Sequence, residues 1–99
     1  MDNTQTVSWI FLALGMASQN STADFAGISQ IADGINHCVP TQKEMQTSLS
    51  WLLSKQLILK IGRKYSLTEN GKNIYRETEN EESTLLKMWE NLGHKLSLL

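Results

Sequence analysis

Residues 40–71, PTQKEMQTSLSWLLSKQLILKIGRKYSLTENG, constrain the fold of this chain more than any other segment. Thr41, followed by Glu44 three residues later, is a capping-box pattern, in which the hydroxyl and the carboxylate each accept a hydrogen bond from a backbone N–H. The pair Gly62-Arg63 stands between two short runs that favour β-structure, and glycine in the first position is typical of a type II′ turn. The segment therefore predicts a capped helix, a tight hairpin and the start of another helix.

The same part of the chain collects the positive charge. Residues 41–76 contain seven basic residues against two acidic ones, a net charge of +5, whereas residues 1–40 and residues 77–99 carry −3 each. The overall charge of −1 hides this asymmetry. A basic segment between acidic flanks is the electrostatic pattern expected for binding a phosphate backbone, and a solvated charged surface is the simpler alternative.

Length and composition predict a single domain that covers residues 1–99. Cys38 is the one cysteine, so no disulfide can form within the chain, which fits the reducing cytoplasm. The most apolar run, residues 9–17, is far shorter than the roughly 20 residues that cross a bilayer, and no cationic residue precedes it. We expect a cytoplasmic protein without a membrane segment.

Apolar periodicity predicts the remaining helices. Residues 6–18 are apolar on nearly every face, residues 24–36 have one apolar stripe, residues 68–79 follow the hairpin, and residues 83–99 have a wide stripe. Two such apolar helices in so small a chain favour a homodimer over a purely internal core. The residues expected at the dimer interface are Trp9, Leu12, Leu85, Met88, Trp89, Leu92 and Leu96.

The second half of the chain resembles a known DNA-binding family. A leucine-rich rhythm (Leu49, Leu52, Leu53, Leu57, Ile58) leads into Tyr-x-Leu-Thr-x-x-Gly, which ends at Gly71. This pattern, over about residues 25–78, resembles the winged helix-turn-helix domain of small MarR- and PadR-type bacterial regulators. The resemblance implies an α+β, mainly α, fold with a short two-stranded wing and terminal dimerisation helices.

The resemblance also implies which residues meet duplex DNA. The recognition helix is residues 41–55, and the wing is the hairpin. Gln46 is placed to reach a base edge, with adenine as the usual partner of glutamine, and Thr41 and Gln42 are placed to meet a phosphate. Trp51 is expected to pack against a neighbouring element. The full expected DNA-binding set is Thr41, Gln42, Lys43, Gln46, Thr47, Ser50, Ser54, Lys60, Arg63 and Lys64.

The expected function is duplex DNA binding by a homodimeric transcriptional regulator. The alternative is a winged helix that serves as a protein-interaction module, which the two-residue turn and the absence of arginine in residues 41–55 also fit. No spacing typical of a nucleophile, a phosphate loop or a metal site organises the residues, so we expect no enzyme activity and no cofactor. His37, Cys38 and His94 do not make a tetrahedral metal site.

Overall fold

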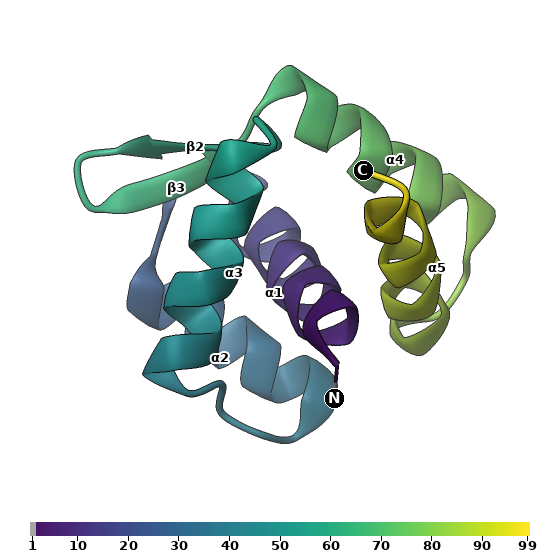
Figure 1. Cartoon of the computed structure of the whole chain (residues 1–99), viewed down its shortest axis with the longest axis horizontal. Coiled ribbons are helices and arrows are strands. Elements are labelled where there is room, and N and C mark those ends of the chain that lie inside the picture. The colour runs from purple at the N-terminus through teal and green to yellow at the C-terminus, as the bar shows by residue number, and fades with distance from the viewer. Residues whose placement is uncertain (1) are drawn as a thin grey trace.

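Residues 2–99 form five helices and a small three-stranded antiparallel sheet. The fold class is α+β and mainly helical, as the sequence predicts. The structure is a computed structural model and describes residues 2–99 (Figure 1). In chain order the elements are α1 (Asn3–Ala17), β1 (Ala23–Asp24), α2 (Phe25–Asn36), α3 (Gln42–Ser54), β2 (Ile58–Ile61), β3 (Lys64–Leu67), α4 (Glu69–Glu81) and α5 (Leu85–Ser97).

Side-chain caps decide where the helices begin. The predicted capping box of Thr41 and Glu44 is present at α3, and Thr68 caps α4 by accepting a hydrogen bond from the N–H of Gly71. The first helix begins earlier than the expected residue 6, because Asp2 and Gln5 form a second capping box. Such reciprocal bonds satisfy two N–H groups that a helix start would otherwise leave without partners.

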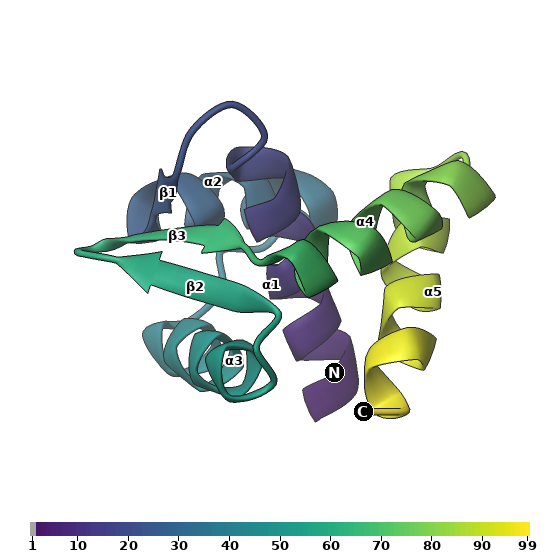
Figure 2. The same cartoon turned by 90° about the horizontal axis from the view of Figure 1, so that it is seen from above.

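The hairpin forms as predicted, and the sheet contains one strand that was not predicted. Ile61 pairs with Lys64 across the turn, and Gly62 has the positive φ of 64° that the first position of a type II′ turn requires. The additional strand is β1, in which Ala23 pairs with Tyr65. The strand order β1-β3-β2 makes β3 the central strand and ties the start of α2 to the hairpin (Figure 2).

Helix α1 is the centre of the molecule. All its residues from 7 to 15 are buried, and α2, α3 and α5 pack around it (Figures 1 and 2). The indole N–H of Trp9 donates to the carbonyl of Ala32 in α2 at 2.8 Å, which fixes one side of the helix. No helix among residues 2–99 has the length and apolar character needed to span a bilayer.

Helix α5 covers the other side of α1. Trp89 packs on Trp9 with ring centroids 6.1 Å apart, and its indole N–H donates to the carbonyl of Gln5 at 2.8 Å. Gly93 of α5 faces Ser8 of α1, and a Cβ added to Gly93 would lie 3.4 Å from the Ser8 hydroxyl. The second apolar side of α1 is therefore covered by the chain itself.

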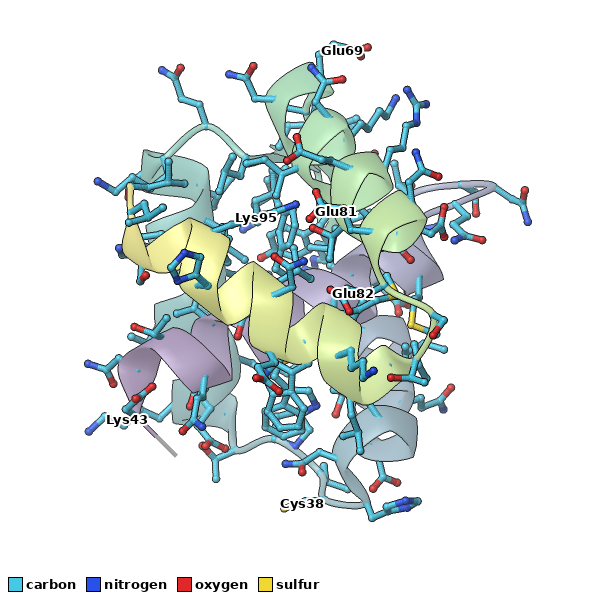
Figure 3. The ribbon with its side chains drawn as sticks, turned by 90° about the vertical axis from the view of Figure 1, so that its right-hand side faces the viewer. Cys38, Lys43, Glu69, Glu81, Glu82 and Lys95 are labelled. Atoms are coloured by element: carbon cyan, nitrogen blue, oxygen red, sulfur yellow. The ribbon has the colours of Figure 1, made fainter. Side chains whose placement is uncertain are left out.

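A polar clamp holds α5 against α4. The ammonium of Lys95 lies 3.2 Å from the carboxylate of Glu77, 3.0 Å from that of Glu81 and 3.0 Å from the hydroxyl of Thr78 (Figure 3). The hydrogen bond from Lys95, supported by a second from Asn91, lowers the pKa of Glu81 below its ordinary value. The clamp makes α4 and α5 a joined pair.

Candidate nucleic-acid interface

The buried stripe of α3 determines which of its residues face outward. Met45, Ser48, Leu49 and Leu52 are 0–3 % exposed, and α3 packs through this side on α1. A helix that buries residues at this spacing turns the residues between them to solvent. The outward side of α3 is therefore set by the core.

A continuous exposed stripe runs along α3 and consists of Lys43, Thr47, Ser50 and Ser54, which are four, three and four residues apart. We call it the outer stripe. Gln46 is also exposed, beside the stripe. All residues of the expected DNA-binding set are exposed, namely Thr41, Gln42, Lys43, Gln46, Thr47, Ser50, Ser54, Lys60, Arg63 and Lys64.

Two members of the set already have partners within the chain. The hydroxyl of Thr41 accepts from the N–H of Glu44 at 3.0 Å as part of the cap, and the hydroxyl of Ser54 donates to the carbonyl of Trp51 at 2.6 Å. The cap also occupies Glu44, whose carboxylate accepts from the N–H of Thr41 at 2.9 Å. The negative charge on α3 is thus turned toward the start of the helix.

The basic residues of the segment 41–76 are free of ion pairs. Within residues 2–99 the two ion pairs both belong to Lys95, so all seven cations of this segment lack a carboxylate partner. Lys60 lies over the ring of Tyr65 with its Nζ 5.8 Å from the ring centroid, and Arg63 and Lys64 lie at the hairpin turn. These positive charges are available to an external anion.

Lys55 is an additional cation beside this surface that the expected set does not include. It is the C-terminal cap residue of α3, and its Nζ lies 5.7 Å from the centre of the Trp51 ring. The four-residue spacing between the two was visible in the sequence as a helical contact distance. Lys55 extends the basic surface from α3 toward the hairpin.

Acidic residues gather on the side of the molecule opposite α3 and the hairpin, where Lys72 and Arg76 of α4 and two lysines of α5 accompany them. The hairpin and α3 lie on one side in Figure 1, and α4 and α5 lie on the other. The second side contains the glutamates of the acidic C-terminal segment, Glu77, Glu79, Glu81, Glu82 and Glu90. The asymmetry read along the sequence is therefore also an asymmetry in space.

Most of the residues expected at a dimer interface are buried in the core of the single chain. Trp9, Leu12, Met88, Leu92 and Leu96 are 0–6 % exposed in the single chain, because α5 packs directly on α1. Five of the seven expected interface side chains are therefore core residues, and that part of the prediction is corrected.

The other two expected interface residues keep contact with solvent. Trp89 is half-buried, and Leu85 is 41 % exposed at the start of α5.

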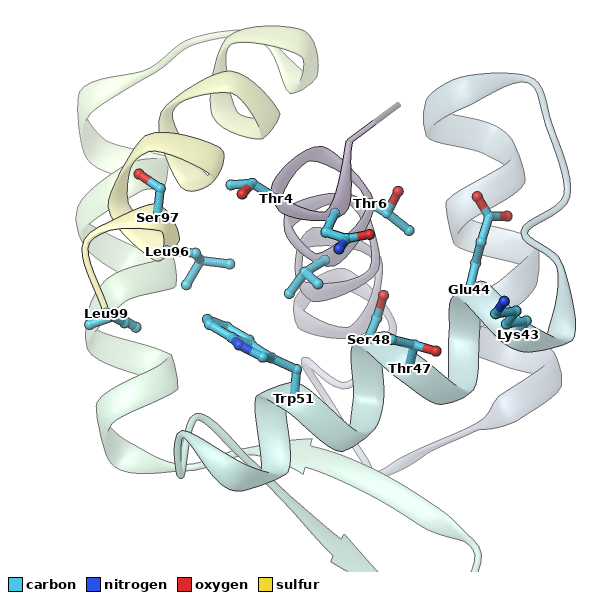
Figure 4. Close-up of a pocket in the computed structure, with 12 residues that line it drawn as sticks. Thr4, Thr6, Lys43, Glu44, Thr47, Ser48, Trp51, Leu96, Ser97 and Leu99 are labelled. Atoms are coloured by element: carbon cyan, nitrogen blue, oxygen red, sulfur yellow. The ribbon is translucent and has the colours of Figure 1, made fainter.

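A groove between α3 and α5 was not predicted. Both helices pack on α1 and leave between them a hollow of about 460 Å³, which Val7, Ser48, Trp51 and Leu96 help to line (Figure 4). Trp51 packs against the edge of the core, as expected, and its ring extends into this groove. The sequence signal was Ser48, a hydroxyl at a core position of an otherwise apolar stripe.

No family model, curated protein or solved structure matches this chain.

Proposed function

We propose that this protein is a winged helix-turn-helix transcriptional regulator that binds duplex DNA through α3 and the β2–β3 hairpin. The observation that carries the proposal is a set of five cations without ion pairs on α3, its C-cap and the hairpin, namely Lys43, Lys55, Lys60, Arg63 and Lys64, on the side opposite most of the glutamates. Unpaired cations are the groups that replace counterions on a phosphate backbone, and this exchange dominates the affinity for DNA.

The outer stripe of α3 suits close contact with the floor of a major groove. Its side chains are small, apart from Lys43, so the helix axis can approach the bases of a groove about 12 Å wide. The side chains of Gln46 and Ser50 have no hydrogen bond within residues 2–99 and can offer one to a base edge. Lys43, near the start of the helix, can meet a phosphate.

The hairpin supplies a second contact region beside the helix. Arg63 and Lys64 lie at its turn, and Ile61 beside them is 60 % exposed. A turn of two residues keeps the tip short, so these cations reach the backbone next to the groove that α3 occupies. Phosphate contacts of this kind position a protein on DNA, and contacts to base edges supply its specificity.

We also propose that the protein forms a homodimer. The contact between the two copies uses exposed residues of α5, not the side chains buried in the core. Leu85 and Leu86 are 41 % and 66 % exposed at the start of α5, and they offer an apolar edge to a second copy. Sedimentation of the wild type and of Leu86→Glu at high micromolar concentration tests this. Dimer in the first and monomer in the second is the expected result, and a monomeric wild type contradicts it.

Fluorescence anisotropy with labelled duplex DNA at several salt concentrations tests DNA binding. Lys43→Ala and Arg63→Ala should each weaken binding and reduce the slope of log K against log [salt] by about 0.9, the loss of one phosphate contact. Lys87→Ala, an exposed lysine on α5, is the matched control and should change neither quantity. Absence of binding at about 50 mM salt would reject the DNA proposal and favour a protein-interaction module.

A further inference from the structure

A second hollow lies where the end of α1, strand β3 and α4 meet (Figure 2). Its volume is about 170 Å³, well above the roughly 10–15 Å³ that a single water needs. Gly15 of α1 makes room for one wall, because a Cβ on Gly15 would lie 2.5 Å from the ring of Tyr75. We call this hollow the α4 pocket. It shares no residue with the outer stripe or with the groove between α3 and α5.

Lys72 of α4 is a half-buried cation that lines this pocket without an ion pair. Within residues 2–99, Lys72 and Lys95 are the two lysines that are not exposed. Lys95 is held by two carboxylates and a hydroxyl, whereas the side chain of Lys72 has neither an ion pair nor a hydrogen bond. Burying part of a charge costs free energy unless a partner compensates it. The ammonium of Lys72 therefore favours an anion from outside the chain.

Two more donors line the pocket from the same helix. Arg76 follows Lys72 by four residues, so the two cations lie on one face of α4. The hydroxyl of Tyr75 accepts a hydrogen bond from the side-chain amide of Gln19 at 3.5 Å, and its own proton has no acceptor in the part of the chain that the structure describes. Burial, and then the charge of Glu79, raise the pKa of Tyr75, so this hydroxyl remains a donor at neutral pH.

The whole lining defines the class of ligand. Glu79 is its one carboxylate beside two cations, which gives the pocket a net charge of +1. A guanidinium fork beside an ammonium suits an oxyanion. Donors on three elements suit the tetrahedral oxygens of a phosphate better than the two oxygens of a carboxylate, which share one plane. The side chains with N–H or O–H donors are Ser18, Gln19, Ser66, Lys72, Tyr75 and Arg76.

We infer that the α4 pocket binds a phosphate group in a diester. Lys72 and Arg76 neutralise the group, and the hydroxyl of Tyr75 donates to one of its oxygens. Glu79 limits the negative charge that the pocket accepts, so a phosphodiester with a single charge fits better than a monoester, which carries about −1.5 to −2 at pH 7. The group belongs either to a small phosphodiester or to a nucleic-acid backbone. The site itself does not rest on the proposed function.

Titration with dimethyl phosphate at constant ionic strength, followed by proton–nitrogen NMR, tests the site. We expect saturable shifts of the Gln19 side-chain amide and of the Arg76 Nε–H, assigned through Arg76→Gln. The three indole signals should stay in place, because no tryptophan lines this pocket. Methyl phosphate and acetate should both bind more weakly. Acetate that binds as tightly as dimethyl phosphate would overturn the phosphate assignment, and tighter binding of methyl phosphate would overturn the preference for a diester.

Two pairs of charge variants separate a built site from general electrostatic attraction. Lys72→Gln should weaken dimethyl phosphate binding about three- to tenfold, whereas Lys87→Gln removes the same charge from an exposed position of α5 and should not change it. Glu79→Gln should tighten binding up to about fivefold, and Glu90→Gln, outside the pocket, should not. Equal effects within either pair, or no saturable shift at about 10 mM, ten times a millimolar Kd, would overturn the site.

Anisotropy with duplex DNA identifies the source of the phosphate. If the pocket holds a nucleic-acid backbone, Lys72→Gln should reduce the slope of log K against log [salt] by about 0.9. An unchanged slope, with dimethyl phosphate still bound by the wild type, assigns the pocket to a small phosphodiester. A protein that binds dimethyl phosphate and no DNA would keep this site and remove the proposed function.

Discussion

The α1–α5 half and the α3–hairpin half of this molecule use their side chains in opposite ways. In the first half, the indole groups of Trp9 and Trp89 pack on each other and each donates to a backbone carbonyl. In the second half, the Trp51 indole N–H has no acceptor, and the five cations of α3, its C-cap and the hairpin have no ion pair within residues 2–99. Groups that do not contribute contacts to the fold are the ones available for binding, which is why we place function in the second half.

The largest expected effect on stability comes from replacing one tryptophan in each half. Trp9→Ala should lower the free energy of unfolding by about 3–5 kcal/mol, because it removes a fully buried ring and its hydrogen bond. Trp51→Ala, at a half-buried position, should cost less than half as much. Urea denaturation measures both, and equal losses would contradict the division into a structural and a binding half.

A glycine pair tests how tightly the hairpin is joined to α4. A Cβ on Gly71 would collide with the backbone carbonyl of Leu57, which accepts a hydrogen bond from the N–H of Thr68. We expect Gly71→Ala to cost about 1–3 kcal/mol through the forced backbone shift. Gly34→Ala, with open space around the added carbon, should stabilise by about 0.4–1 kcal/mol in the same urea experiment. A neutral Gly71→Ala would show that this junction is loose.

The cap of α3 offers a smaller test within the binding half. Thr41→Ala removes the hydroxyl that accepts from Glu44 and should cost about 1 kcal/mol. Thr47→Ala, an exposed hydroxyl on the same helix, should change stability by less than about 0.5 kcal/mol. Thermal unfolding of both variants measures the difference, and a larger loss from Thr47→Ala would mean that the outer stripe stabilises the fold.

The smallest expected effect concerns the pH dependence of the clamp between α4 and α5. The pKa of Glu81 is lowered in the folded chain, mainly by the hydrogen bond from Lys95, so its stabilising contribution is present above the ordinary carboxyl pKa and is lost as the pH falls through the lowered value. Lys95→Met should therefore lower the Tm at neutral pH and approach the wild type in acid. Lys87→Met is the matched control, and a pH-independent Tm difference for Lys95→Met would assign the effect to packing.

Local chemistry made much of the fold predictable from the sequence. The capping box of Thr41 and Glu44, the Gly62 turn and the apolar stripes act over three or four residues, so each could be identified without knowledge of the rest of the chain. Helical periodicity also gave the exposed positions of Lys43, Thr47, Ser50 and Ser54 in α3.

The sequence did not determine what each apolar helix packs against. The apolar stripes of α1 and α5 predicted that each helix needs a partner, and a stripe cannot tell a second copy from another helix of the same chain. A two-residue strand such as β1 has too few residues for any pattern. The groove beside Ser48 depends on the relative placement of three helices, which local signals do not contain.

The hydrogen bond from Trp89 to Gln5 joins positions 84 residues apart. Closing so long a loop costs entropy before the packing of α1 against α5 can repay it, and such distant contacts slow folding. During synthesis α1 leaves the ribosome long before α5 exists to cover it. Until α5 is made, the side of α1 that faces α5 therefore stays uncovered, while α2 and α3 can already pack on its other sides.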